Sequence, residues 1–326
     1  MKKVLFIGID FYDYDQAIIN EFNSLGFKVD YYSERSTSFK ARIVCRTKNQ
    51  RLIQRIITER NHKIVNSSAN DYDIVFVIKC ENLSIVSLKK IKQKNPNACF
   101  ILYLWDSMNR IPDIKIKFSY FNKIYSFDRI NCLDNDKLIF NPLFYRNEFD
   151  IKEIGNDTYK RDIFFLGWNH SDRLALIKKI AALCDEKKLS YKMILYTGKV
   201  AYWLDCLFNR TLKHNKSFLI FKPLPTKDLI YEIFESRSVL DIAHPKQSGL
   251  TIRTIELLAL RKKIITTNAD IVNYDFYNPA NILVIDRNNP ELPESFFTLE
   301  YHPISEEIRE RYAISNWLRR MVIPNQ

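Results

Sequence analysis

The sequence predicts an α/β protein built from two similar halves, and three observations support this class. Short apolar runs that suit buried strands alternate with longer stretches of helical periodicity. The alternation stops in the turn-rich stretch 141–156 and then starts again. The chain has 326 residues, which suits two domains of about 150 residues each. We therefore expect α/β domains at 1–145 and 146–305, followed by a helical segment at 306–326.

The first half alternates strands and helices throughout. Its expected strands cover 4–9, 28–32, 74–78, 100–104, 123–126 and 138–140. Helices are expected at 15–25 and 84–94, with a basic helical stretch after the second strand. Strands separated by helices imply parallel pairing through right-handed crossovers, as in a Rossmann-like domain. The first turn, Gly8 to Asp13, lacks the G-x-G-x-x-G pattern of dinucleotide sites.

The second half repeats this order and opens, like the first, on a strand that ends in glycine. Its expected strands cover 163–166, 192–196, 218–221, 239–242, 264–267 and 282–285. Helices are expected at 173–187, at 227–236 with Thr226 as its cap, and between the strands 239–242 and 264–267. A final helix is expected at 306–320. The repeat predicts a second Rossmann-like domain.

The stretch 239–268 carries the strongest functional signal. A strand leads through the polar loop His244 to Gly249 into a helix that Thr251 can cap, with Lys262 and Lys263 in its last turn. Ligands of open α/β sheets bind beyond the carboxyl ends of the strands, against helix N-termini. The loop contains a His, a Lys, a Ser and a Gly, and Arg253 and Glu256 follow one turn apart. We expect a site for a phosphorylated ligand here.

At these residues the chain resembles a known family. SGLTIRTIELLALRKKIITTN is similar to the donor-binding segment of GT-B glycosyltransferases, in particular of CgeB-type and surface-polysaccharide enzymes. The segments ILYLWDSMNRIPDI, YFNKIYSFDR and NPLFY resemble the strand ends of the same enzymes. The resemblance implies two Rossmann-like domains facing across a cleft, with the last helix crossing back onto the first domain. It would give Trp317 a role in packing between the domains.

The resemblance also implies roles for single residues. Glu256 would hydrogen-bond the ribose of a nucleotide-sugar donor. The loop and helix start would meet the donor diphosphate through Ser248, Gly249, Thr251 and Arg253. Ser248 stands eight residues before Glu256, where retaining members carry a second Glu, so inversion is favoured.

Further cations and a histidine accompany this segment. Lys246 and Arg253 could neutralise the departing diphosphate, or be solvated surface charges. His244 is either catalytic or a hydrogen-bonded structural residue. Gly167 ends the strand that opens the second half, and Arg173 could assist the next helix N-terminus in binding an anion. The alternative there is a plain strand-to-helix turn with Ser171 as the cap.

An inverting transferase needs a carboxylate from the first domain to remove the acceptor proton. Asp13, after the first strand, is the first candidate, although Asp13 or Asp15 could instead cap the next helix. Asp106, after the fourth strand, is either the second candidate or the cap of a turn, and Trp105 beside it would suit stacking on a sugar. Asp128 is the third. No cluster has metal-ligand spacing, so we expect a metal-independent reaction without a cofactor.

Composition limits the partners and the compartment. The net charge of +12 implies an anionic partner. The basic stretch Lys40 to Lys63 has apolar residues on one helical face, which suits either a membrane-surface element or a solvated helix. No apolar run reaches the ~18 residues of a membrane span. We expect a cytoplasmic protein that can lie on the inner face of the membrane, with its six scattered cysteines buried and reduced.

The favoured hypothesis is a glycosyltransferase. It would move a sugar from a nucleotide-activated donor to a glycan or lipid-linked acceptor in capsule or lipopolysaccharide assembly. One rival is a nucleic-acid-binding protein, but the basic residues concentrate in one helix and no binding-module motif is present. The other rival is a nucleotide-sugar-binding scaffold without catalysis.

Overall fold

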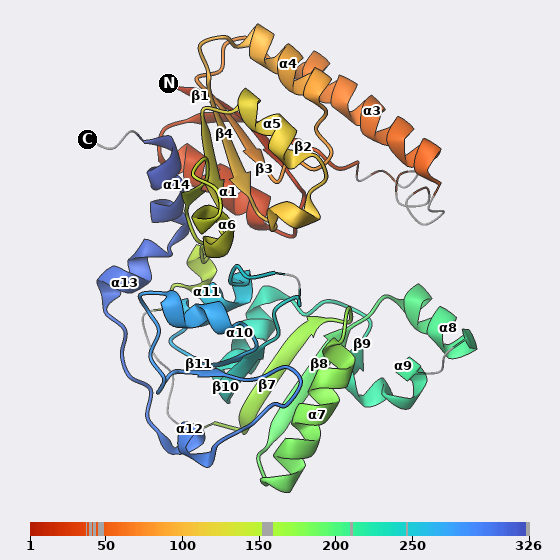
Figure 1. Cartoon of the computed structure of the whole chain (residues 1–326), viewed down its shortest axis with the longest axis vertical. Helices are drawn as coiled ribbons and strands as arrows, with labels where there is room; N and C mark the ends of the chain where they lie inside the picture. The colour runs from red at the N-terminus through yellow and green to blue at the C-terminus, as the bar shows by residue number, and fades with distance from the viewer. Residues whose placement is uncertain are drawn as a thin grey trace. The chain divides into compact units, whose positions relative to one another are not determined.

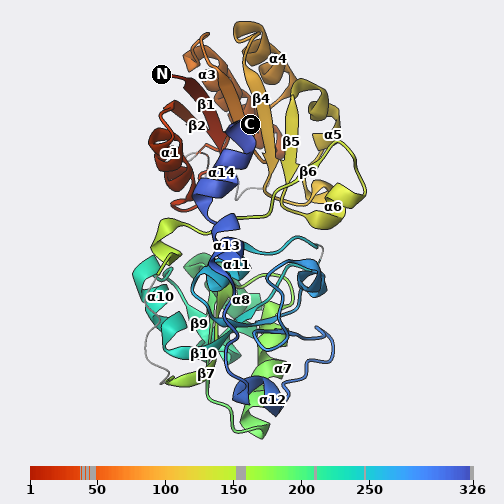
Figure 2. The same ribbon diagram turned by 90° about the vertical axis from the view of Figure 1, so that its left-hand side faces the viewer.

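The computed structural model describes residues 1–36, 38, 41, 44, 49–151, 159–208, 211–245 and 247–323. The chain divides into two compact units. Unit 1 comprises Met1–Arg146 and Tyr312–Gln326, and unit 2 comprises Asn147–Arg311. Each unit is a six-stranded parallel sheet covered by helices (Figures 1 and 2). The last part of the chain therefore belongs to the same unit as the first.

The strands of unit 1 are β1 (Lys3–Gly8), β2 (Lys28–Ser33), β3 (Ile74–Ile78), β4 (Cys99–Leu104), β5 (Lys123–Ser126) and β6 (Ile139–Phe140). Its α-helices are α1 (Tyr14–Ser24), α3 (Gln50–Ser67), α4 (Ile85–Lys94), α5 (Ile114–Lys117), α6 (Arg129–Leu133) and α14 (Ile314–Val322). Short 3₁₀ helices are η1 (Met108–Arg110) and η2 (Phe118–Tyr120). The strand order is β2-β1-β3-β4-β5-β6.

The strands of unit 2 are β7 (Arg161–Trp168), β8 (Tyr191–Tyr196), β9 (Leu219–Ile220), β10 (Ser236–Asp241), β11 (Lys263–Thr266) and β12 (Ile282–Val284). Its α-helices are α7 (Arg173–Glu186), α8 (Lys199–Phe208), α9 (Thr211–His214), α10 (Thr226–Phe234), α11 (Ile252–Ala259), α12 (Glu294–Thr298) and α13 (Glu306–Arg311). Short 3₁₀ helices are η3 (Asn147–Phe149), η4 (Lys216–Phe218) and η5 (Ala269–Asn273). The strand order is β12-β11-β10-β7-β8-β9.

The continuous apolar runs of the central strands explain both sheets. The five residues of β3, IVFVI, are all buried, as expected for a parallel strand with helices on both faces. Alternate residues of the unit 1 strands pack against α3 and α4 on one face of the sheet (Figure 1). On the other face, Phe22 of α1 packs on Phe76 of β3. The sheets therefore follow directly from hydrophobic patterning.

The prediction of a single helix at 306–320 is wrong, because the helix is interrupted between α13 and α14. Tyr145 donates its backbone N–H to Tyr312 O (2.9 Å), and Ile314 donates to Tyr145 O (3.1 Å). This pairing takes the backbone out of the helix between Arg311 and Ile314. Trp317 of α14 is fully buried within unit 1, with its ring 4.3 Å from that of Phe144. Its surroundings are therefore those of a core residue of unit 1.

Two caps and one helix end also differ from prediction. The N-cap of α7 is Asp172 instead of Ser171, and Pro225 precedes α10, so Thr226 lies inside that helix. Helix α11 ends at Ala259, and Arg261 has a left-handed φ of 52°. Lys262 and Lys263 therefore lie outside the helix. Both are buried, and their ammonium groups donate to backbone carbonyls instead of facing the helix terminus.

The cysteines are less uniformly buried than expected. Burial raises the pKa of the Cys80 thiol to about 12, and Cys184 is buried as well. Three others are half-buried: Cys99, Cys132 and Cys206. Cys45 lies outside the described residues. All five described cysteines are free thiols.

Candidate functional site

The carboxyl edge of the unit 2 sheet gathers most of the predicted binding residues. Thr251 is the N-cap of α11 and accepts a hydrogen bond from Thr254 N (3.2 Å), as predicted. The hydroxyls of Thr251 and Thr254 both donate to Asp241 Oδ2, over 2.8 and 2.5 Å. Asp241 ends β10 and is 4% exposed. The start of α11 is thus tied to the end of the strand before it.

Arg173, the first residue of α7, reaches across the end of β7. Its Nη2 donates to Ile242 O (2.6 Å) and its Nη1 to Trp168 O (3.3 Å). Gly167 makes this path possible, because a Cβ there would lie 3.1 Å from Arg173 Nη1 and 2.8 Å from Phe165 Cζ. Burial lowers the pKa of the Arg173 guanidinium, while the nearby carboxylate of Asp241 opposes that shift.

A second arginine at this edge, Arg287, was not predicted. It donates to both carboxylate oxygens of Asp172 (2.6 and 2.8 Å), to the carbonyl of Ala243, and to Thr267 Oγ1 (3.2 Å). Burial of Asp172 works against ionisation, but these hydrogen bonds outweigh it and lower the pKa of that carboxyl. We call Arg173, Arg253 and Arg287, together with the first turn of α11, the cationic edge. Arg287 lies in a loop after β12, so no motif pointed to it.

Arg253 and Glu256 form an ion pair on α11. Arg253 Nη1 lies 3.0 Å from Glu256 Oε2, and the Glu256 side chain is only 2% exposed. The Arg253 side chain is 23% exposed. The charged group that this helix offers to solvent is therefore the guanidinium, with the predicted ribose ligand Glu256 behind it.

The loop before α11 is held by a residue that follows β11. Asn268 Nδ2 donates to the carbonyls of Ser248 (2.8 Å) and Gly249 (3.2 Å). His244 is half-buried, and its ring lies 5.9 Å from that of His170. Lys246, predicted to meet the diphosphate, lies outside the described residues. Asn268 thus supports the loop backbone, and the sequence patterns did not predict this role.

In unit 1, Asp13 and Asp15 occupy different environments. Asp13 is the N-cap of α1 but makes no side-chain capping bond, and its side chain is 82% exposed, 4.0 Å from Arg146 Nη1. Asp15 is 5% exposed and accepts hydrogen bonds from Asp10 N (2.5 Å) and Tyr31 Oη (2.7 Å). Burial raises the pKa of Asp15, although both hydrogen bonds oppose that shift. Of these two acids, Asp13 is therefore the accessible one.

The other two acid candidates are already engaged. Asp106 contacts Arg110 Nη1 (2.9 Å) and Lys79 Nζ (3.3 Å), and its side chain is 14% exposed. Asp128 is fully buried, caps α6 through Asn131 N (3.3 Å), and accepts from Ser107 Oγ (2.6 Å).

Trp105 follows the fourth strand and is half-buried. Its ring packs edge-on against Phe144 (5.5 Å) and Tyr14 (5.8 Å). Much of the indole is therefore occupied by neighbouring aromatic rings.

The basic stretch 40–63 is only partly described, since Lys40, Arg42, Arg46 and Lys48 lie outside the described residues. Its remainder is the first part of α3. Leu52 is 43% exposed there, while Ile64 and Val65 further along pack into the unit 1 core. Arg60 donates to Ser33 O (2.7 Å), so one cation of this helix is structural.

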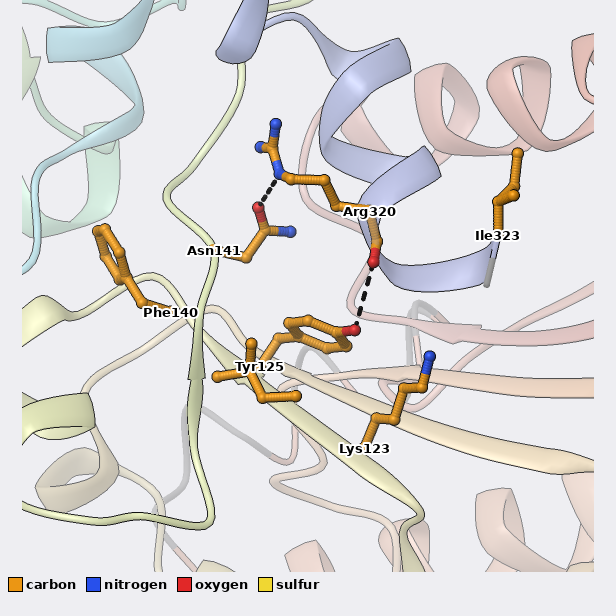
Figure 3. A pocket seen from close by; sticks show the side chains of 7 residues that line it. Lys123, Tyr125, Phe140, Asn141, Arg320 and Ile323 are labelled. Carbon is orange, nitrogen blue, oxygen red and sulfur yellow. Dashed lines mark hydrogen bonds between the residues drawn. The ribbon is translucent and has the colours of Figure 1, made fainter. Parts of the chain in front are cut away.

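A cavity of about 370 Å³ lies elsewhere in unit 1, between the β5–β6 edge and α14. Figure 3 shows Arg320 Nε donating to Asn141 Oδ1 (2.9 Å) and Tyr125 Oη donating to Arg320 O (3.3 Å). Its other lining residues are Lys123, Ile139, Phe140 and Ile323. None of the predicted site residues lines it, so we assign the candidate site by chemistry and topology instead of by cavity size.

The described residues contain neither a metal-binding cluster nor a membrane-spanning helix. No group of three or more His, Cys, Asp or Glu side chains there could hold a metal ion. No described helix has the length and apolar character needed to cross a membrane.

Comparison with known proteins places the fold. No protein-family model and no curated protein matches the chain. Among solved structures, Anabaena HepE in complex with UDP and glucose aligns with a TM-score of 0.62 and 8% identity, over 98% of each chain. A glycosyltransferase from Rickettsia africae aligns with a TM-score of 0.59 and 13% identity, over 98% of this chain and 96% of that one.

A third structure shows that this fold also serves other chemistry. The UDP-GlcNAc 2-epimerase of Methanocaldococcus jannaschii aligns with a TM-score of 0.53 and 12% identity, over 100% of this chain and 94% of that one. At such identities the comparisons establish the architecture, and the activity must be argued from the site. The chain has the two-domain, Rossmann-like GT-B fold that the sequence predicted.

Proposed function

We propose that the protein is a metal-independent glycosyltransferase that takes its sugar from a nucleotide-activated donor. The observation that carries this proposal is the cationic edge of unit 2. Arg253 flanks the capped N-terminus of α11, and Arg173 and Arg287 hold the adjoining carbonyls of Ile242 and Ala243. Helix N-terminal N–H groups and fixed guanidinium groups are the usual partners of a diphosphate. The solved structures of similar fold include complexes with UDP and UDP-glucose.

The reaction requires one bond to form while another breaks. The acceptor hydroxyl oxygen attacks the anomeric carbon, and the bond from that carbon to the phosphate oxygen breaks. The electron pair leaves with the nucleoside diphosphate, where negative charge develops. Arg253 is placed to stabilise that charge, because cations fixed beforehand need no reorganisation as the charge appears. Glu256 orients this guanidinium across 3.0 Å, and it is also our candidate for the ribose contact.

The acceptor proton needs a base, and Asp13 is our first choice. Its carboxylate is 82% exposed, whereas Asp106 contacts two cations and Asp128 is fully buried. An accessible carboxylate can approach an acceptor hydroxyl, which general-base catalysis requires. His244 remains a second candidate for a catalytic role. We favour inversion, because Ser248 replaces the second Glu of the retaining pattern.

The biological setting we propose is the assembly of a bacterial surface polysaccharide such as capsule or lipopolysaccharide. The acceptor would be a glycan or a lipid-linked glycan, handled by a cytoplasmic enzyme on the inner face of the membrane. The resemblance of the donor segment to surface-polysaccharide enzymes and the net charge of +12 support this setting.

The first experiment is a thermal-shift and calorimetry series with UDP, GDP, CMP, TDP and ADP. A ligand that binds only the folded state raises the unfolding temperature, so one base should give a clear shift. UDP is our first choice. The shift should fall in Arg253→Met and Glu256→Gln, which keep the size of each side chain, and persist in the surface control Lys187→Met.

The matching nucleotide sugars are then incubated with and without glycan acceptors, and the products are identified. A sugar transferred to acceptor supports the proposal. If no nucleotide binds and the protein binds RNA or DNA in a salt-sensitive way, it is a nucleic-acid-binding protein instead. Donor epimerised without transfer would assign the fold to the other chemistry seen among its structural relatives. Binding without any turnover would leave a scaffold.

A further inference from the structure

Helix α8 presents an apolar face that no described residue of its own unit covers. Its exposed large hydrophobic residues recur every three or four positions, which places them on one side of the helix. Their exposed fractions run from 51% to 79%. They are Val200, Trp203, Leu204, Leu207 and Phe208. The other exposed large hydrophobic residues of the described chain are spread over many elements, so α8 carries a concentration of them.

The opposite face of α8 is fastened to unit 2, which fixes the direction of the apolar face. The Tyr202 ring packs on Phe221 with centroids 5.0 Å apart. Asp205 Oδ2 accepts a hydrogen bond from Leu212 N (2.6 Å), and Leu212 is part of the unit 2 core. In Figure 1, α8 and α9 stand beyond β9 at the side of the unit 2 sheet. The polar side of α8 is therefore used for attachment, and its apolar side points outward.

The surroundings of α8 are basic. The stretch 199–222 has a single acid, Asp205, which is already bonded to the backbone of α9. The same stretch contains the cations Lys199, Arg210, Lys213, Lys216 and Lys222. Of these, Lys199, Lys213, Lys216 and Lys222 are exposed in the structure. An apolar helical face bordered by cations complements an anionic lipid surface.

We propose that α8 is a membrane-surface helix that inserts Trp203, Leu204, Leu207 and Phe208 among the headgroups and upper acyl chains of an anionic bilayer. Ten residues make a helix about 15 Å long, which suits lying in the interface and is too short to span it. Tryptophan favours this depth because its ring is apolar and its N–H can still bond to water or headgroups. Helix α8 is a different segment from the basic stretch 40–63, for which a membrane-surface role was considered from the sequence.

The topology places the start of α8 near the carboxyl edge of the unit 2 sheet. Helix α8 follows the carboxyl end of β8, and all strands of this sheet run parallel. The cationic edge lies at the carboxyl ends of the same sheet. A bilayer that holds α8 would therefore lie near the edge of unit 2 at which we expect the donor. The proposal itself does not rest on the reaction, since lipid binding is measured without donor or acceptor.

The test is flotation of the full-length protein with vesicles. One set contains three parts phosphatidylcholine and one part phosphatidylglycerol, and the other contains phosphatidylcholine alone. We expect binding to the anionic set and a drop of about ten-fold or more in partitioning for Trp203→Ser/Leu207→Ser. The matched control is Val86→Ser/Ile116→Ser, which removes similar side chains that are 63% and 60% exposed on unit 1. That control should float like the wild type.

A second variant locates the insertion. Trp203→Phe keeps the apolar face, so it should float normally but lose the part of the fluorescence quenching that brominated lipids cause in the wild type. Absence of vesicle binding, or equal binding by wild type and Trp203→Ser/Leu207→Ser, overturns the proposal. The proposal is also overturned if Arg51→Glu/Arg55→Glu on α3 loses vesicle binding while Trp203→Ser/Leu207→Ser keeps it. A lipid-free dimer that becomes a monomer in the α8 variant would assign the face to a contact between copies instead.

Discussion

The first strand of each unit has a glycine at or near its end, over which a charged side chain lies, and the two side chains, Asp15 and Arg173, have opposite charge. In unit 1, Gly8 ends β1, and a Cβ there would lie 2.8 Å from the carboxylate of Asp15 in the first turn of α1. In unit 2, Gly167 lies near the end of β7, and a Cβ would meet Arg173 Nη1 of α7 at 3.1 Å. Each glycine thus leaves room for a charged side chain to lie over the end of the strand.

The difference in charge separates the chemistry of the two edges. Burial raises the pKa of Asp15 and lowers the pKa of Arg173, so in both units the charged form is held against its desolvation. The unit 1 turn leaves the carboxylate of Asp13 accessible. The unit 2 edge gathers three arginines. One backbone arrangement can therefore prepare either an acid or an anion-binding edge, depending on a single residue of the following helix.

The largest expected effect is on turnover. Asp13→Asn should lower kcat by about 10²–10⁴-fold, because general-base catalysis contributes about that much. The Kd for the donor should change little, since the donor is assigned to unit 2. Steady-state kinetics with calorimetry separate the two quantities. Asp106→Asn is the control, and a greater loss of kcat in that variant than in Asp13→Asn would contradict our choice of base.

The second largest effect is expected from the loss of Arg173, the cation that lies over the end of β7. Arg173→Met should weaken donor nucleotide binding by about 100-fold, through loss of charge and of its hold on Ile242 O. Asp15→Asn is the counterpart in unit 1 and should leave nucleotide affinity within about three-fold. Calorimetric titration of both folded variants measures this. Equal weakening by the two changes would erase the contrast between the edges.

Both glycines should resist enlargement. Gly8→Ala and Gly167→Ala should each destabilise the protein by about 1–3 kcal/mol, because the new methyl group overpacks a filled space. Chemical denaturation followed by circular dichroism measures this loss. Gly26→Ala is an unsuitable control since Gly26 has a φ of +81°, whereas Gly198→Ala meets nothing within 4 Å. A destabilisation by Gly198→Ala as large as by the other two would show that crowding is not the cause.

The smallest effect concerns a buried acid at the unit 1 edge, Glu34. Burial raises its pKa from 4.5 to about 7, although Asn82 N and Glu81 N donate to it. Between about pH 5 and 7 the folded state therefore holds a proton that the unfolded state has lost. Stability should fall as pH rises through this window, by about 1 kcal/mol per pH unit relative to Glu34→Gln. Urea denaturation of both proteins across this range measures their free energies of unfolding. A wild-type free energy of unfolding that rose with pH relative to that of Glu34→Gln would refute the assignment.

The fold class and the order of the strands along the chain could be predicted from local sequence patterns. Runs such as IVFVI and the alternation with helices depend on neighbours within a few residues, and so does the cap that Thr251 provides. Hydrophobic periodicity and capping are local, which is why they can be read without a structure. The same reasoning missed α8, whose large apolar residues are exposed and belong to no core of the described chain.

The accessibility of each charged group, by contrast, depends on contacts between residues far apart in the sequence. Arg173 bonds to a carbonyl 69 residues away, and Arg287 to a carboxylate 115 residues away. The sequence treated Asp13, Asp106 and Asp128 as similar strand-end acids, yet one is exposed, one contacts two cations and one is fully buried. Likewise, the break at Tyr312 depends on pairing with the distant Tyr145. Side-chain burial and long-range partners arise from the whole folded chain, so local pattern cannot supply them.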